Sequence, residues 1–393
     1  MKWGGTLGSG GECLGRRPAL DGVRAVAVAA VIAQHLGMPW LANLGVLLFF
    51  TLSGFLITTL LLEEAEANGR VSLLRFWGRR ALRLLPALAA LVAVVGGYCL
   101  VVPGFLFGRP TLDGVPWVLG YAANWRIAGG HSLGLFQHLW SLAVEEQFYV
   151  VWPLLVVLLA AREPGRGRER AVLLMSVAGV LAVFVQRAVL MPGAVDGSLI
   201  SRTDAVADQL LVGCALAAVW RLLHGRPLRW RRAVAWGLLG AAAAGHVWLA
   251  GAPVSRPFPA ALTTSGGYVA LALANAALIA HVVVHRGGPV ARLLAWRPLV
   301  AVGRRSYGLY LWQLPAIGFV AYYVSLGPLV KGVVAVPLSL ALAWLSFRFV
   351  EQPFLRRQER LRPAAAAEPA AAEPAPSAPP WPAPAVPQLT GGG

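Results

Sequence analysis

The chain has 393 residues, of which 58% are hydrophobic and only 13% are charged. Soluble globular proteins carry about a quarter of charged residues, so this composition excludes an ordinary water-facing domain. The net charge of +17 does not indicate nucleic-acid binding. The arginines stand in short clusters between long apolar runs, which is the pattern that the positive-inside rule expects of a membrane protein.

Ten apolar runs are long enough to cross a hydrocarbon core of about 30 Å. We therefore predict an all-α, polytopic helix bundle with spans at residues 20–37, 43–62, 81–102, 140–161, 171–190, 204–222, 233–251, 265–285, 306–326 and 332–350. The first run is interpreted as a retained helix and not as a leader peptide, because it contains Arg24 and His35 and further spans follow at once.

The distribution of Lys and Arg predicts the orientation in the membrane. With the N-terminus inside, 26 of these 34 residues fall in inner segments and six in outer segments, which places both termini in the cytoplasm. We expect a cytoplasmic segment at 1–17, a membrane domain at 18–357 and a disordered, Ala/Pro-rich cytoplasmic tail at 358–393. The outer segment 103–138 is long and aromatic, which fits either an interfacial belt or a functional lid.

The three cysteines, Cys13, Cys99 and Cys214, have no metal-binding spacing, and no metal site is predicted. Cys99 and Cys214 lie in apolar runs, where a thiol behaves as a small core residue.

Ionisable side chains within the spans are the main functional signal, because a bilayer makes them costly. Arg24 and His35 are eleven residues apart, which returns them to nearly the same face of a helix about 16 Å apart. Arg80 and Arg83 share a helical face with Arg79 close by, which suits a phosphate-rich ligand. For this cluster alone, ordinary anchoring at the inner interface is the favoured explanation.

The fourth span opens with two adjacent carboxylates, Glu145 and Glu146, which would cost several kcal/mol if they faced lipid. Ser141 and Glu145 share one helical face, and Glu146 turns away from it. We therefore expect only one of the two carboxylates to act in a shared site.

Three further spans carry polar or small residues at helical spacing. Asp204 and Asp208 lie one turn apart at the outer end of the sixth span. Gly45, Ser53 and Gly54 in the second span predict close helix packing and no chemistry. The ninth span has a polar stripe of Ser306, Tyr307, Tyr310 and Gln313. Interhelical hydrogen bonding is the favoured role for Ser306 and Gln313.

On the predicted topology these groups form two sets. The cytoplasmic set is Arg24, Arg79, Arg80 and Arg83, and the outer set is His35, Glu145, Glu146, Asp204 and Asp208. A phosphate-bearing donor would enter from the cytoplasm and reach acid/base groups deep in the bundle, which suits a group-transfer reaction.

The ordered motifs resemble those of the membrane acyltransferase 3 family. They run over about residues 18–357 and comprise Arg24-x10-His35, Gly45–Ile57 with Phe49-Phe50 and Ser53-Gly54-Phe55, Arg80-x-x-Arg83, Leu139–Tyr149, Arg202-Thr-Asp204, Ser306–Trp312 and Glu351–Phe354.

The resemblance implies a multi-pass enzyme of the bacterial inner membrane. It would move an acetyl or another short acyl group from acyl-CoA, acetyl-CoA above all, to a hydroxyl of a carbohydrate, glycolipid or macrolide-type acceptor. By analogy, His35 is the acid/base residue, made more basic by Glu145 or an aspartate. The arginines at 24, 79, 80 and 83 bind the coenzyme, and acceptor or supporting roles fall to Ser141, Glu146, Asp204, Asp208, Tyr307 and Tyr310.

Two departures from the family pattern are visible. Gln313 stands where many members have His, so a second imidazole is absent from that position. Some relatives also carry a fused extracytoplasmic hydrolase-like domain; without it, we expect direct transfer or delivery to a separate protein. The main alternative function is a proton-coupled transporter or flippase that uses the buried His and carboxylates. A non-catalytic scaffold would leave those groups unexplained.

Overall fold

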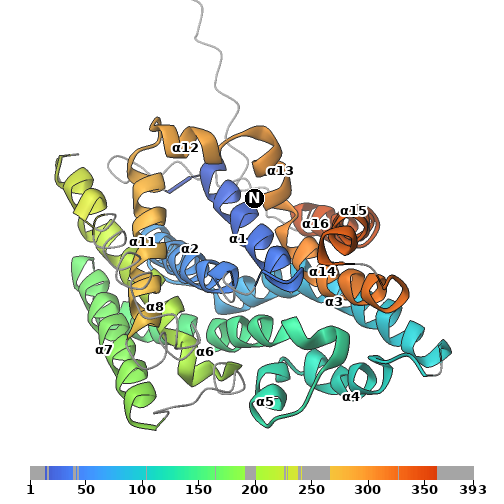
Figure 1. Ribbon diagram of the computed structural model, residues 1–393. Helices are drawn as coiled ribbons and strands as arrows, with labels where there is room; N and C mark the ends of the chain where they lie inside the picture. The colour runs from blue at the N-terminus through green and yellow to red at the C-terminus, as the bar shows by residue number, and fades with distance from the viewer. Residues whose placement is uncertain are drawn as a thin grey trace, which may run out of the picture.

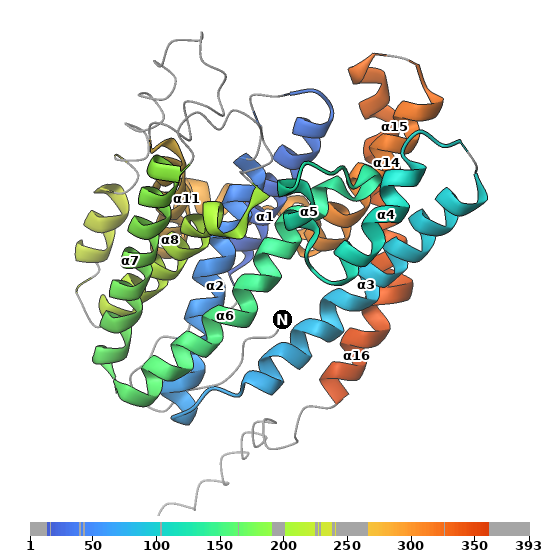
Figure 2. The ribbon, with the colours of Figure 1, turned by 90° about the horizontal axis from the view of Figure 1, so that it is seen from below.

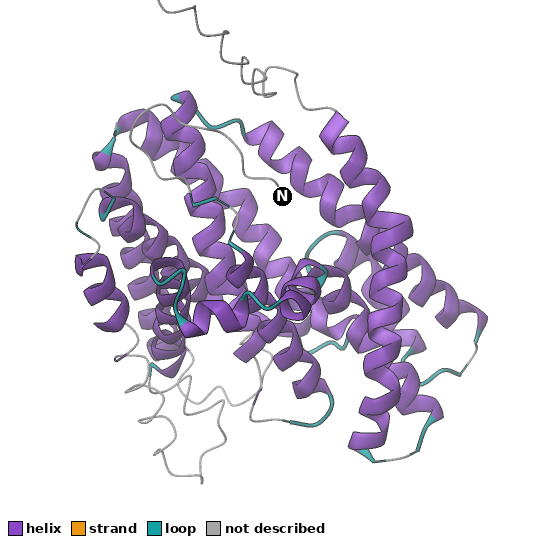
Figure 3. Ribbon diagram, turned by 90° about the horizontal axis from the view of Figure 1, so that it is seen from above, coloured by secondary structure: helices purple, strands orange, loops and turns teal. Residues whose placement is uncertain are grey.

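The computed structural model describes residues 14–360, except 16, 39–40, 42–43, 103, 164, 191–200, 225–226, 228, 238–239, 241–265 and 326. Every regular element in these residues is helical (Figure 3), which confirms the predicted fold class. Most of the predicted span 233–251 and most of the segments 1–17 and 358–393 lie outside the described residues.

The helices coincide with the other nine predicted spans, and several short helices connect them. In chain order the structure has α1 (Pro18–His35), α2 (Leu44–Asn68), α3 (Leu73–Val101), α4 (Gly108–Leu119), α5 (Ala123–Ala128), the 3-10 helix η2 (Gly134–Leu139), α6 (Trp140–Arg162), α7 (Arg166–Leu190), α8 (Thr203–Leu222), α11 (Gly267–Val284), α12 (Pro289–Leu294), α13 (Arg297–Arg304), α14 (Ser306–Tyr323), α15 (Pro328–Leu345), the π-helix η4 (Ser346–Glu351) and α16 (Gln352–Arg360).

Among the described residues, seven helices are long and apolar enough to cross a membrane, so the protein is a multi-pass membrane protein. These are α2, α3, η2 with α6, α7, α8, α11, and α15 with its continuation to Arg356. Helices α1 and α14 also match predicted spans but are not among these seven. The count of ten spans and the cytoplasmic termini stay predictions.

Helices α1 and α2 lie in the middle of the bundle (Figure 1). Helices α7, α8 and α11 lie on one side of them, and α3 and α14–α16 lie on the other. Figure 2 shows α3 running obliquely away from α6. The predicted outer segment 103–138 folds into α4, α5 and η2, which pack against α3, α6 and α14.

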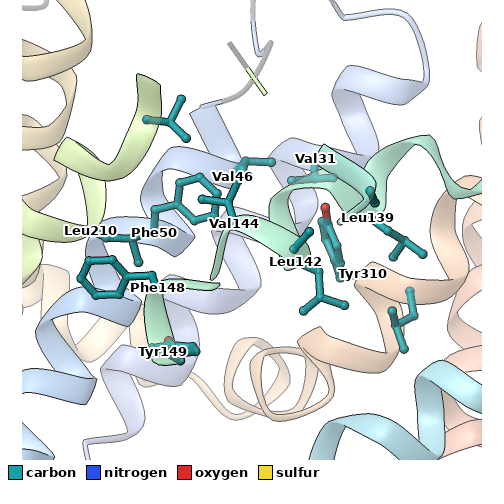
Figure 4. Packing of buried hydrophobic residues seen from close by; sticks show 14 of the residues in the cluster. Val31, Val46, Phe50, Leu139, Leu142, Val144, Phe148, Tyr149, Leu210 and Tyr310 are labelled. Atoms are coloured by element: carbon teal, nitrogen blue, oxygen red, sulfur yellow. The ribbon is translucent and has the colours of Figure 1, made fainter. Parts of the chain in front are cut away.

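Small residues in α2 let its neighbours approach closely, as the sequence predicts. A Cβ on Gly45 would lie 2.3 Å from the Ala27 carbonyl oxygen of α1, and one on Gly54 would lie 1.9 Å from that of Leu210 in α8. The core between α2, α6 and α8 is filled by apolar side chains such as Phe50 (Figure 4). Cys99 and Cys214 are buried, as expected.

Candidate active site

His35 is the last residue of α1, and its half-buried ring faces α14. Its Nδ1 lies 2.9 Å from the side-chain oxygen Oε1 of Gln313. This contact confirms the predicted interhelical hydrogen bond of Gln313. It also corrects the expectation of a carboxylate partner, because α14 packs directly against α1 and brings an amide to the imidazole.

A second imidazole, which the sequence analysis did not single out, belongs to His138 at the end of η2. His138 is buried, and its Nε2 lies 3.1 Å from the carbonyl oxygen of Leu311 in α14. The charges of His138 and His35 are close enough to influence each other. The position was overlooked because it precedes the fourth predicted span, although it lies directly before the Leu139–Tyr149 motif.

Tyr310 connects η2, α6 and α14. Its hydroxyl lies 2.6 Å from the Oγ of Ser141 and donates to the carbonyl oxygen of His138. The Tyr310 and His138 rings are 5.3 Å apart. The structure therefore brings Ser141 and Tyr310, two of the predicted supporting residues, to the His35 end of the site.

Glu145 and Glu146 both face the guanidinium of Arg80. Arg80 Nη2 lies 2.7 Å from Glu146 Oε1 and 3.5 Å from Glu145 Oε1. Both carboxylates therefore share one guanidinium, although adjacent positions on a helix point in different directions; that only one of them acts stays a prediction. The separation of Arg80 from the Glu145 and Glu146 set is corrected, because the long Arg80 side chain reaches from α3 to the carboxylates of α6.

Glu145 has two further partners, Ser53 and Tyr149, and the sequence analysis gave Ser53 a packing role only. Ser53 of α2 donates to Glu145 Oε1 at 2.5 Å, and Tyr149 donates to the same oxygen at 2.7 Å. The Arg80 guanidinium lies 3.3 Å from the centre of the Tyr149 ring. A carboxylate with three partners is held in a fixed position.

Arg83, one turn after Arg80, forms no ion pair within the described residues. The charges of Arg24, Arg80 and Glu351 all act on it. Glu351 was quoted in a motif but not proposed as a site residue. It is buried at the end of η4, and such π-helical turns are frequent at functional sites.

Arg24 and Arg79 have acidic neighbours of their own. Arg24 Nη1 lies 3.4 Å from Asp21, so it is only weakly paired. Arg79 is 44% exposed and lies 3.7 Å from Glu64 of α2. Arg79 is thus turned away from Arg80 and Arg83.

Asp204 and Asp208 do not join His35, and this expectation is corrected. Arg187, at the end of α7, makes two hydrogen bonds to Asp208 at 2.6 and 2.9 Å, and both side chains are buried. Asp204 accepts from Arg202 at 2.6 Å and from Gln186 at 2.7 Å. The two aspartates therefore tie α7 to α8.

Tyr307, the remaining predicted supporting residue, donates to the carbonyl oxygen of Leu84 at 2.9 Å and so ties α14 to α3. Its hydroxyl is within reach of the charges of Glu146, Arg80 and Glu351. Tyr307 thus lies next to Arg80 and its two carboxylate partners.

The family model described as an acyltransferase domain matches residues 17–348. The chain belongs to this acyltransferase family. The match covers most of the chain and confirms the resemblance seen in the ordered motifs.

Three curated relatives of the acyltransferase are named as O-acetyltransferases. It is 31% identical over 352 residues to "O-acetyltransferase OatA" of Staphylococcus aureus and 33% identical over 354 residues to "Peptidoglycan O-acetyltransferase OatA" of Listeria monocytogenes. It is 35% identical over 359 residues to "Putative peptidoglycan O-acetyltransferase YrhL" of Bacillus subtilis. Each match covers 86% of the acyltransferase but only 57%, 55% and 54% of these relatives, so it spans a little over half their length. No solved structure matches it.

The polar groups of the acyltransferase form a row through the bundle. His35 and His138 stand at one end, Ser141 and Tyr310 follow, and Glu145 lies one turn further along α6. The row continues through the guanidiniums of Arg80 and Arg83 to that of Arg24. It thus has two imidazoles at one end and guanidiniums at the other.

Proposed function

We propose that the acyltransferase moves an acetyl or another short acyl group from acyl-CoA to a hydroxyl of a glycan. Membership of the acyltransferase family supports acyl transfer. The names of the Listeria and Bacillus relatives favour a peptidoglycan-type sugar hydroxyl over the glycolipid and macrolide acceptors.

The observation that carries this proposal is the contact between His35 and Gln313. An amide oxygen only accepts hydrogen bonds, so Nδ1 of His35 holds its proton towards Oε1 of Gln313. Nε2 then keeps a lone pair and can act as a general base. This arrangement fixes the ring without any carboxylate.

In the proposed reaction His35 first takes a proton and later returns it. Nε2 of His35 takes the proton of the acceptor hydroxyl, and the hydroxyl oxygen attacks the thioester carbonyl of acyl-CoA. The carbon–sulfur bond breaks, the acyl group stays on the acceptor oxygen, and the coenzyme leaves as a thiolate. The imidazolium returns its proton to the thiolate, which gives free CoA.

Arg83 and Arg24 are the proposed contacts of the coenzyme phosphates. Arg83 has no ion pair in the described part of the chain, and its charge and that of Arg24 repel each other. A phosphate between two guanidiniums would relieve this repulsion, and arginine binds phosphate in a bidentate manner. The carboxylates of Glu145 and Glu146 already neutralise Arg80. In this scheme Arg80 therefore positions those carboxylates and does not bind phosphate.

The proposal includes the topology predicted from the arginine distribution. In an inner membrane with both termini in the cytoplasm, Arg24 lies near the cytoplasmic face and His35 towards the outer face. Acyl-CoA would bind from the cytoplasm and the glycan from outside. The alternative of a transporter or flippase is not favoured, because the chain matches an acyltransferase family over most of its length.

The test is acyl transfer by the purified full chain in lipid nanodiscs. Free thiol released from acetyl-CoA is measured with and without a soluble peptidoglycan fragment, and the base-labile acetyl ester on the fragment is detected by mass spectrometry. His35→Ala should reduce transfer to background while membrane insertion is kept. The matched control is His131→Ala, since His131 is exposed in the outer segment. Absence of acceptor-dependent thiol release in the wild type, or full activity of His35→Ala, would refute the proposal.

A further inference from the structure

Tyr121 has an unusual backbone conformation directly after α4. Its φ angle is +51°, and it is the only residue other than glycine with positive φ in the described part of the chain. The N–H of Tyr121 bonds to the carbonyl of Val118, and that of Ala122 bonds to the carbonyl of Trp117. These two bonds define a Schellman motif with Tyr121 at the left-handed position, where glycine is preferred.

The sequence places a glycine next to this position but not in it. Gly120 precedes Tyr121 and has an ordinary φ of −82°. A bulky residue in the left-handed region is strained, and such strain persists only where the surrounding structure imposes it. The backbone of Tyr121 is therefore held in this conformation by its surroundings.

Gln147 of α6 holds this strained turn. Its Nε2 donates to the carbonyl oxygen of Tyr121 at 2.7 Å and to Asn124 Oδ1 at 2.9 Å. Its Oε1 accepts from Thr203 of α8 at 2.5 Å. The turn is thus attached to α6 one residue after Glu146.

The phenol of Tyr121 is half-buried beside the charged centre of the bundle. The charges of Glu146 and Arg80 act on its hydroxyl, and Tyr307 is also near. The hydroxyl has no hydrogen-bond partner among the residues that the structure describes. Burial and the Glu146 carboxylate raise the pKa of Tyr121 above its usual range, so the phenol keeps its proton and can donate it to a hydrogen bond.

We infer that Tyr121 is an acceptor-binding residue, whose hydroxyl donates a hydrogen bond to a hydroxyl or ring oxygen of the glycan. This inference rests on the proposed function. The α4–α5 segment belongs to the predicted outer side, from which the acceptor would arrive, whereas the coenzyme phosphates are assigned to Arg24 and Arg83. The Tyr121 ring packs against the core, and its strained turn holds, beside Arg80 and Glu146, a hydroxyl that has no partner within the described residues, which fits a substrate contact.

The test compares Tyr121→Phe with the wild type in the nanodisc assay, with acceptor and acetyl-CoA varied in turn. We expect kcat/KM for the glycan fragment to fall about tenfold or more, because a polar group of the acceptor loses its donor. KM for acetyl-CoA and the midpoint of thermal unfolding should stay unchanged. The matched control is Tyr322→Phe, since Tyr322 is 42% exposed at the end of α14.

A second variant, Tyr121→Gly, separates substrate binding from structure. Glycine adopts a positive φ without strain, which offsets part of the packing lost with the phenol ring, so we expect this variant to stay folded while it loses acceptor turnover as Tyr121→Phe does. If Tyr121→Phe keeps full kcat/KM for the glycan, or changes only KM for acetyl-CoA, the inference is overturned while the proposed function stands. A wild type without any transfer would instead overturn both.

Discussion

Arg80 of α3 and Glu146 of α6 join two helices that diverge in Figure 2. The guanidinium donates from Nε and from Nη2, at 3.0 and 2.7 Å, to the same carboxylate oxygen. Trp77 adds a hydrogen bond from its indole to the carbonyl oxygen of Tyr149 at 2.9 Å. These side-chain contacts therefore hold α3 to α6.

Arg80→Gln should destabilise the protein by about 1–3 kcal/mol, because it leaves the partly buried carboxylates of Glu146 and Glu145 without a cation. Thermal unfolding in detergent measures this loss. The double variant Arg80→Gln/Glu146→Gln should recover a large part of it, since the two amides can bond to each other. The control is Arg109→Gln, because Arg109 is 88% exposed and its contact with Asp113 is an ordinary surface pair. Equal stability of Arg80→Gln and Arg109→Gln would contradict a role for the ion pair.

Gln313→Leu should lower kcat for acyl transfer by about 10- to 100-fold, the range seen when the group that orients a histidine is lost. Leucine has nearly the same size as glutamine but leaves Nδ1 of His35 without an acceptor, so the ring can rotate or change tautomer. Steady-state kinetics with saturating substrates provide the measurement. Gln313→Glu keeps an acceptor oxygen and should retain more activity than Gln313→Leu; the reverse order would argue against the orienting role.

Arg83→Gln should raise KM for acetyl-CoA by about tenfold, the effect of losing roughly 1.4 kcal/mol of binding. Stability should not decrease, because Arg83 has no ion pair within the described residues and repels Arg24. Arg79→Gln is the matched control from the same helix, since Arg79 is 44% exposed and turned towards Glu64. If both variants bind acetyl-CoA as the wild type does, for example by isothermal titration in nanodiscs, the phosphate site lies elsewhere.

The fold was largely predictable because apolar runs of membrane-spanning length are long, unambiguous signals. The polar stripe of α14 was also visible at helical spacing. The predicted interhelical bond is confirmed for Gln313, whereas within the described residues Tyr307 and Tyr310 make such bonds and the Ser306 side chain does not. Close packing at Gly45 and Gly54 followed from their size alone.

The partners within the site were not predictable, because depth along a helix does not determine which helices cross. Arg80 was placed with the cytoplasmic arginines, yet the oblique path of α3 brings it to Glu146. Asp208 was placed near His35, but Arg187 lies opposite it on α7. Ser53 stood among apolar residues, and only the position of α6 reveals its bond to Glu145.

Gly54→Ala should destabilise the bundle by about 1–3 kcal/mol, the usual cost of extra volume in a packed core. The added Cβ would lie 1.9 Å from the carbonyl oxygen of Leu210, and backbone atoms cannot yield as a flexible side chain does. Because α2 also carries Ser53, the shift of α2 from α8 should disturb Glu145 and lower transfer as well.

The control is Gly97→Ala in α3, where no atom lies within 4 Å of the new Cβ. In that open position alanine should stabilise the helix by about 0.5–1 kcal/mol. Thermal unfolding of both variants in the same detergent tests the contrast, and a Gly54→Ala protein as stable as Gly97→Ala would show that α2 and α8 are not packed backbone to backbone.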